Sequence, residues 1–318
     1  MLATHKKKSY YDCIVPVSGG KDGSYVAYNL KHKYKMNPLC VTVKPHTPSI
    51  LGEKNLNNFI KSGYSLISVD TNYEAMRSIN KLGFTDMGMA YYGWLISIFS
   101  AVIRVAINFD IKLIFYAEDG EIEYGGSTEN EKNHIFNIDY IKKIYVEGGY
   151  EKIIKKANIS DVDKFFFTFP ENEALHKNIQ LTHWSYFENW DPYRNYVLAK
   201  KECGLAELDE TNVGTFTNFA QNDQLLCSLH YYLMYLKFGF GRANQDASIE
   251  IRRGAISREQ AINLVRIYDN HYPEEFIKDY LEYYKMNRSE FDLVIDKWVN
   301  KDLFEKKNNY WQPKFEIF

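Results

Sequence analysis

The residues that offer the clearest chemistry form a glycine-rich turn near the start of the chain. A short apolar run is followed by seven such residues: Ser18, Gly19, Gly20, Lys21, Asp22, Gly23 and Ser24. Two adjacent glycines let the backbone bend sharply and approach an anion closely. If a helix begins at this turn, its first N–H groups and its positive dipole end point at that anion. Because hydroxyl groups and the Lys21 ammonium would add donors, we expect the turn to bind phosphate.

Asp22 is the residue that a pure anion site does not explain, since a carboxylate repels phosphate. A Mg²⁺ ion that bridges the carboxylate and the phosphates would remove that repulsion. The turn is not a Walker A loop, because the GxxxxGK[ST] spacing is absent. The alternative is an ordinary strand-to-helix turn in which the glycines only permit the bend. We expect a nucleotide site with Asp22 as its metal contact and with Asp22 and Lys21 as catalytic residues.

The elements that must position this turn alternate along the first half of the chain. Apolar runs that predict strands lie at 13–17, 39–43, 65–69 and 112–116, and helical patterns lie near 53–61, 73–81 and 91–108. Such alternation predicts an α/β fold, a parallel sheet with helices on both faces. Ligands of these sheets bind at the carboxyl ends of the strands, which is where the glycine-rich turn lies.

The second half changes to a mainly helical pattern. Ser257 with Gln260 three residues later predicts one helix start, because the pair can form a capping box. We therefore expect three parts: a basic tail at 1–10, a nucleotide-binding α/β region at 11–175, and a mainly helical region at 176–318. The last region would contact the substrate or a partner.

Composition narrows the function classes. The 318 residues include 39 Lys plus Arg and 41 Asp plus Glu, so the net charge of -2 argues against a dedicated nucleic-acid binder. Four cysteines without a CxxC pair predict neither a disulfide framework nor a zinc ribbon. The longest apolar run, 94–109, is interrupted by Arg104 and is shorter than the ~20 residues a bilayer requires. We expect a cytoplasmic protein without a nucleic-acid or membrane partner.

The glycine-rich turn resembles the SGGxDS loop of the PP-loop ATP pyrophosphatases, whose fold is adenine nucleotide alpha hydrolase-like. It departs from that loop at Gly23, where the family usually has Ser or Thr, and Ser24 follows one position later. Further segments resemble the N-acetyl sugar amidotransferases of that superfamily: 116–126, 190–192, 214–218, 235–254 and 256–268. The resemblance covers roughly residues 11–300.

This resemblance implies an AMP-forming carbon–nitrogen ligase of bacterial surface-sugar biosynthesis. Family members convert an acetamido group to an acetamidino group, on O-antigen sugars of lipopolysaccharide or on the pseudaminic or legionaminic acids that decorate flagellin. ATP adenylates the amide oxygen, and ammonia then displaces AMP. The implied cofactors are ATP and Mg²⁺. The implied partners are a glutaminase that supplies ammonia and a cyclase-like subunit.

The acidic segment after the fourth predicted strand supplies further candidates. Glu118 and Glu123 could bind Mg²⁺, orient sugar hydroxyls or take a proton from the attacking ammonium, so we expect catalytic roles for them. Tyr124, Gly125 and Gly126 are candidate substrate contacts, because the two glycines would permit a close backbone approach. The alternative is that this loop is solvated surface.

Arg242 and Asp246 are also candidate substrate contacts, since the forked donors of Arg suit a carboxylate or phosphate. A helix-end ion pair is the alternative. For the whole chain, the competing functions are a tRNA-modifying PP-loop enzyme, a ligase similar to NAD or GMP synthetase, and a non-catalytic scaffold. The absence of CxxC pairs and of a basic surplus argues against the first of these.

Overall fold

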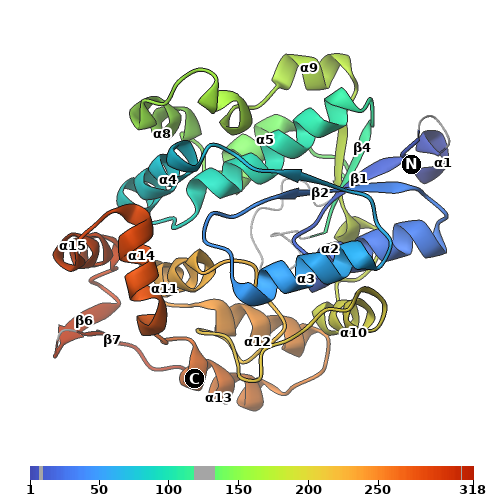
Figure 1. Ribbon diagram of the computed structural model, residues 1–318. Helices are drawn as coiled ribbons and strands as arrows, with labels where there is room; N and C mark the ends of the chain where they lie inside the picture. Colours follow the sequence, from blue (N-terminus) through green and yellow to red (C-terminus); the bar gives the residue numbers. More distant parts are fainter. Residues whose placement is uncertain (7–9, 118–132, 309) are drawn as a thin grey trace.

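Five parallel strands form the central sheet of the computed structural model, which describes residues 1–6, 10–117, 133–308 and 310–318 (Figure 1). Across the sheet the order is β3 (Leu66–Val69), β2 (Pro38–Val43), β1 (Cys13–Pro16), β4 (Leu113–Tyr116) and β5 (Gln180–His183). The predicted parallel sheet is confirmed, and all four predicted strands are present. Because the chain passes from β1 outward to β3 and then resumes at β4, the order reverses between β1 and β4. The glycine-rich turn follows β1 and therefore lies at this switch point.

The fifth strand is an addition to the predicted fold. β5 lies beyond residue 175, where the sequence predicts the end of the α/β region, and it pairs in parallel with β4 from Leu113↔Gln180 to Tyr116↔His183. Three of its four residues, Gln-Leu-Thr-His, are polar, so they give no continuous apolar run. The sheet therefore extends into the region that was expected to be mainly helical.

Helices cover both faces of the sheet, and each face has its own core (Figure 1). On one face lie α4 (Tyr73–Leu82) and α5 (Tyr92–Asn108), and on the other lie α2 (Lys21–Tyr28), α3 (Ile50–Lys61) and α10 (Pro192–Cys203). Ile14 points to the α5 side, while Cys13 and Val15 point to the α2 side, as the two-residue period of a strand requires.

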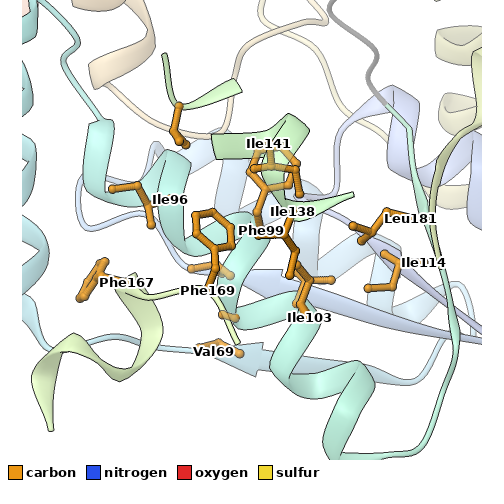
Figure 2. Packing of buried hydrophobic residues seen from close by; sticks show 14 of the residues in the cluster. Val69, Ile96, Phe99, Ile103, Ile114, Ile138, Ile141, Phe167, Phe169 and Leu181 are labelled. Carbon is orange, nitrogen blue, oxygen red and sulfur yellow. The ribbon is translucent and has the colours of Figure 1, made fainter. Parts of the chain in front are cut away.

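Figure 2 shows the core on the α5 face. Ile96, Phe99 and Ile103 of α5 pack toward Ile114 of β4 and Leu181 of β5, and the 138–169 segment closes the far side. Each fully buried side chain of this size contributes about 2 kcal/mol to folding. This core makes the sheet a rigid support for the turn after β1.

The remaining elements lie mostly in the C-terminal part of the chain. They are α1 (Leu2–His5), α7 (Ile138–Tyr140), α8 (Tyr150–Ala157), α9 (Glu171–His176), α11 (Leu226–Phe238), α12 (Arg242–Arg252), α13 (Arg258–Tyr268), α14 (Ile277–Tyr284), α15 (Arg288–Trp298) and the antiparallel hairpin β6 (Phe304–Lys307) and β7 (Tyr310–Pro313). Short 3₁₀ and π turns occur at Asn29–Lys33, Gly83–Met87, Ile141–Tyr145, Asp163–Phe167, Trp184–Tyr186 and Glu274–Phe276. The capping box predicted at Ser257 and Gln260 is present at the start of α13. The helical C-terminal region is thus confirmed.

A third core joins this helical region to the sheet region. Phe84 and Ala90, which flank the turn between α4 and α5, are buried against Tyr284 of α14 and Phe291 of α15. Phe84 stacks on Tyr284 with ring centroids 4.9 Å apart. None of the helices in the described residues combines the length and the apolar character that a bilayer crossing requires.

Candidate functional site

The glycine-rich turn is pressed against α3. Val17 continues the strand pairing by donating its N–H to the Val41 carbonyl at 2.9 Å, and α2 then begins at Lys21 with Gly20 as its N-cap. Gly19 has a φ of +86°, and a Cβ there would lie 2.4 Å from the backbone nitrogen of Leu56 on α3. Only glycine fits both requirements, so the turn and the start of α2 are fixed at the edge of the sheet.

A small pocket opens in front of this turn. Three segments line it: the turn itself (Ser18, Gly20, Lys21, Asp22, Gly23), the first half of α3 (Gly52, Asn55), and part of the chain between α10 and α11 (Leu205, Phe219, Ala220, Gln221, Asn222, Asp223). Its volume is about 50 Å³. A single water needs roughly 10–15 Å³ on this measure. The phosphate-loop pocket, as we call it, therefore takes a group of a few heavy atoms and not a whole nucleotide.

Lys21 and Asp22 form a buried ion pair beside this pocket. Each residue is about 5% exposed, and the Lys21 ammonium donates to Asp22 Oδ2. The other carboxylate oxygen, Oδ1, accepts a hydrogen bond of 2.9 Å from the side-chain amide of Asn195 on α10. A buried carboxylate requires such partners, because losing its hydration is costly. Both oxygens of Asp22 are thus occupied, and its orientation is set by two different elements.

Asn195 is a site residue that the sequence did not reveal. It is fully buried and lies one turn into α10, whose N-cap Asp191 accepts from the Arg194 N–H at 2.9 Å and whose first residue is Pro192. Asp followed by Pro is a recognisable helix start. That signal locates α10, but nothing in the sequence indicates that this helix packs along α2.

Ser24, which belongs to the predicted phosphate-binding turn, is not among the residues that line the pocket. It is fully buried, and its N–H donates to the Gly20 carbonyl at 3.3 Å. Its hydroxyl lies beside the Cys203 thiol of α10. Ser24 lies one residue too far along the first turn of α2, so its side chain faces α10 instead of the phosphate position.

Gly23, in contrast, does line the pocket. A Cβ at this position would lie 3.0 Å from the Pro16 carbonyl oxygen and 3.1 Å from Val17 Cγ1. Both distances are tighter than ordinary contact, so a Ser here would require the turn to shift by a few tenths of an ångström. The departure from the PP-loop pattern is therefore matched by close packing of α2 on the end of β1.

The segment 204–225 between α10 and α11, which we call the strap, forms the outer wall of the pocket. Asn55 of α3 donates to the Ala206 carbonyl at 3.0 Å and accepts from the Ala206 N–H at 2.8 Å. Further along, the Ser49 N–H donates to the Asp223 carbonyl at 3.1 Å. A Cβ on Gly52 would lie 2.7 Å from the Asn222 carbonyl oxygen, so the strap rests directly on the first turn of α3.

Arg242 and Asp246 anchor the strap and do not face the pocket. Both are buried, and Arg242 Nη2 lies 2.9 Å from Asp246 Oδ1. The Thr215 hydroxyl of the strap donates to Asp246 Oδ2 at 2.5 Å, and the Arg242 guanidinium lies over the Tyr231 ring. The structure thus shows the ion pair that was the alternative interpretation, while the role of the two residues as substrate contacts stays a prediction. Buried charges need partners within the fold, and Asp246 finds them in Arg242 and in Thr215. The bond to Thr215 attaches the strap to α12.

Residues 213–316 match the family model described as LPS biosynthesis protein WbpG-like, C-terminal domain. No curated protein matches the chain. The matched region begins in the strap, so it contributes Phe219 to Asp223 to the wall of the phosphate-loop pocket. It also contains the Arg242–Asp246 pair. The match supports the resemblance to proteins that act in surface-sugar biosynthesis.

The acidic segment after β4 was predicted to complete the site. Glu118, Glu123, Tyr124, Gly125 and Gly126 lie outside the described residues, and their roles stay predictions. The described parts of the chain hold no group of three or more His, Cys, Asp or Glu side chains arranged for a metal ion. Among the described residues, Asp22 is the predicted metal contact that lines this pocket.

Buried histidines near the sheet have ordinary packing roles. The His46 ring stacks on Tyr73 at 5.0 Å, and burial lowers its pKa although Asp70 lies 3.6 Å away. His230 of α11 packs against Tyr91 at 4.5 Å, and burial lowers its pKa to about 4. Neither ring lines the phosphate-loop pocket.

Proposed function

We propose that this protein is an ATP-dependent amidotransferase of bacterial surface-sugar biosynthesis. It would convert an acetamido group of a nonulosonic acid or O-antigen sugar to an acetamidino group and release AMP and pyrophosphate. The observation that carries this proposal is the phosphate-loop pocket at the switch point of the sheet. One of its walls belongs to the WbpG-like region. The predicted phosphate site and part of the WbpG-like region thus border the same pocket, which supports the proposal.

The pocket fits a phosphate group. At its floor the first N–H groups of α2 have no partner within the helix, as at any helix start, and the dipole adds positive potential. The Ser18 hydroxyl lies near Gly20, since a Cβ on Gly20 would be 3.3 Å from Ser18 Oγ. The narrow volume suits the β or γ phosphate, while the rest of ATP would extend along the carboxyl edge of the sheet.

The Lys21–Asp22 pair gives this pocket a way to accept a metal-bound triphosphate. Without ATP, the two charges neutralise each other beside the pocket. An arriving phosphate would compete with Asp22 for the Lys21 ammonium, and Asp22 Oδ2 would then be available to hold Mg²⁺. Mg²⁺ would supply charge neutralisation for the departing pyrophosphate. Asp22 and Lys21 would thus act on the same leaving group from two sides.

The proposed reaction has two steps. The amide oxygen of the acetamido group attacks the α phosphorus of ATP, the bond to pyrophosphate breaks, and an adenylated imidate forms. Ammonia then adds to the imidate carbon, the bond to AMP breaks, and a proton is lost to leave the amidine. Water must be excluded because it would hydrolyse the imidate back to the amide. Glu118 or Glu123 is our candidate for the proton acceptor, on the family resemblance.

Two partners complete the proposal. Ammonia would come from a glutaminase subunit, and a cyclase-like subunit could accompany it, as the resemblance implies. The competing functions are a tRNA-modifying PP-loop enzyme and a ligase similar to NAD or GMP synthetase. The net charge of -2 weighs against a tRNA substrate, because RNA binding requires a basic surface. The WbpG-like match favours a sugar over a nucleotide as the acceptor.

Replacement of Asp22 tests the proposed role of the pocket. Asp22→Asn keeps the shape of the side chain and removes the charge, so pyrophosphate release from ATP should fall at least about 100-fold, the scale of a lost electrostatic contact to the leaving group. Asp12→Asn is the matched control, since it also removes the charge of a buried carboxylate, but at the opposite end of β1 and outside the lining of the pocket. If both variants remain folded and Asp22→Asn releases pyrophosphate at the wild-type rate, the pocket is not the ATP site.

A further inference from the structure

The contact between Asn195 and Asp22 joins the predicted site to a helix that the sequence did not implicate. We propose that Asn195 is a positioning residue, which keeps the Asp22 carboxylate aimed at the phosphate-loop pocket while Lys21 transfers to the phosphates. This inference rests on the proposed function and adds to it the element, α10, that orients the metal contact Asp22.

The geometry supports this role because the two oxygens of Asp22 have different partners. Lys21 holds Oδ2, and Asn195 holds Oδ1 through its amide at 2.9 Å. Lys21 carries a full charge and neighbours the pocket, so an incoming phosphate attracts it. The Asn195 amide is neutral and fully buried, so a phosphate attracts it far less than it attracts Lys21.

The bond from Asn195 matters most once Lys21 has left Asp22. A carboxylate with no remaining partner would be free to rotate about its last torsion, and its free oxygen would no longer face the pocket. The bond from Asn195 prevents this rotation and leaves Oδ2 as the oxygen presented to a cation. Because α10 packs along α2, the position of Asn195 is set by the fold and not by the ligand.

A second observation shows that Asn195 is an unusual choice for packing alone. Its Oδ1 atom is buried and, within the described part of the chain, has no hydrogen-bond partner. A buried acceptor without a partner destabilises a fold, and an apolar side chain of the same size would avoid that cost. The amide therefore serves the one contact that it does make, which is the bond to Asp22.

The structure supplies a matched control in Asn29. This asparagine is also buried, and its amide donates to the Tyr25 carbonyl at 2.9 Å within α2 and its continuation, away from the pocket. Asn29→Leu and Asn195→Leu thus both replace a buried amide with an apolar group of similar size. Asn195→Ser is a smaller second variant, in case the leucine does not fit.

The test is a Mg²⁺ titration of nucleotide binding by calorimetry, with α,β-methylene-ATP as the probe. The Mg²⁺ concentration for half-maximal binding should rise about tenfold in Asn195→Leu and in Asn195→Ser, the effect of one charge-assisted hydrogen bond. Asn29→Leu should match the wild type. A merely structural role would lower the melting temperature and leave the Mg²⁺ requirement unchanged.

The outcomes separate this inference from the proposed function. If the wild type binds the probe and a folded Asn195 variant has the same Mg²⁺ requirement, Asn195 does not position Asp22 and the proposed function stands. If the wild type does not bind the probe at any Mg²⁺ concentration, the ATP site itself is wrong and both proposals fall.

Discussion

Asn55 and Ala206 hold each other by two hydrogen bonds, although 151 positions separate them in the chain. The Asn55 side chain bonds both the N–H and the carbonyl of Ala206, as the backbone of a neighbouring β-strand would. Asn55 also lines the phosphate-loop pocket. The strap is thus attached to α3 by a residue that itself lines the pocket.

Replacing Asn55 should therefore loosen the pocket wall. Asn55→Ala removes two hydrogen bonds to a part-buried backbone and should lower the free energy of unfolding by about 2 kcal/mol. ATP affinity should fall as well, because the strap is no longer held. Denaturant unfolding and calorimetry measure the two effects.

Asn58 provides the control for this prediction. It lies one turn further along α3, where its amide makes a single, more exposed hydrogen bond of 2.8 Å to the Gly204 carbonyl. Asn58→Ala should cost about 0.5–1 kcal/mol and leave ATP affinity unchanged. Because Gly204 is the first residue of the strap, equal losses of ATP affinity in the two variants would show that the Asn55 contact has no special part in holding the pocket wall.

The two serines of the glycine-rich turn should differ in their effect on ATP. Ser18 lines the pocket, whereas the Ser24 hydroxyl faces Cys203. Ser18→Ala should raise the ATP KM by roughly tenfold, the effect of one hydrogen bond to a charged phosphate. Ser24→Ala should leave KM within about twofold, since that hydroxyl makes no phosphate contact. The reverse order would mean that the turn rearranges when the nucleotide binds.

Stability should respond to pH through two groups with opposite effects. Burial raises the pKa of Asp269 from 3.8 to about 6, although the N–H groups of Gly241 and Asn244 favour its charged form. The folded state then holds a proton that the unfolded state has lost, so this group destabilises the fold as pH rises from 4 to 6. The low pKa of His230, about 4, acts in the opposite direction, because the unfolded state gains a proton as pH falls below 6.5.

Single replacements should expose each contribution. In Asp269→Asn, the His230 effect remains, so stability should fall more steeply on acidification from pH 6.5 to 4 than in the wild type. In His230→Phe, the Asp269 effect remains, and the same acidification should be less damaging. Each difference amounts to roughly 3 kcal/mol across that range. Urea unfolding at several pH values measures it, and parallel profiles for all three proteins would contradict the assigned environments.

The isolated chain should use free ammonium and not glutamine. Its four cysteines are all buried, and burial raises the pKa of Cys203 to about 11, so none is an accessible thiolate nucleophile for glutamine hydrolysis. Amidine formation should require added ammonium, and an added glutaminase partner should restore glutamine use. Rapid turnover with glutamine by the pure chain would refute this expectation.

The sheet was predictable because its strands carry their own signal. The runs that became β1 to β4 are short, apolar and separated by helical patterns, and the glycine-rich turn marks the switch point. β5 was missed because its polar residues dilute that signal. Local sequence patterns therefore predicted the part of the pocket that one continuous segment forms, the glycine-rich turn after β1.

The other half of the site depends on contacts between distant segments. The strap has neither helical nor strand periodicity. Asn55 of α3 attaches the strap to α3, and Asn195 of α10 contacts Asp22 of the turn, each through one side chain. No spacing in the sequence identifies such pairs. Arg242 and Asp246 show the converse, because their spacing of four residues fits a ligand site and an ion pair equally well, and only the structure shows that the ion pair forms.

The central claim is that this protein uses ATP to convert an acetamido group to an amidine. The most direct measurement is incubation with ATP, Mg²⁺, ammonium and a panel of acetamido sugars, with nucleotides separated by chromatography and sugars weighed by mass spectrometry. We predict AMP and pyrophosphate in step with a sugar lighter by about one mass unit, from exchange of oxygen for NH. ADP and phosphate as products, or ATP consumption without any change in sugar mass, would contradict the account.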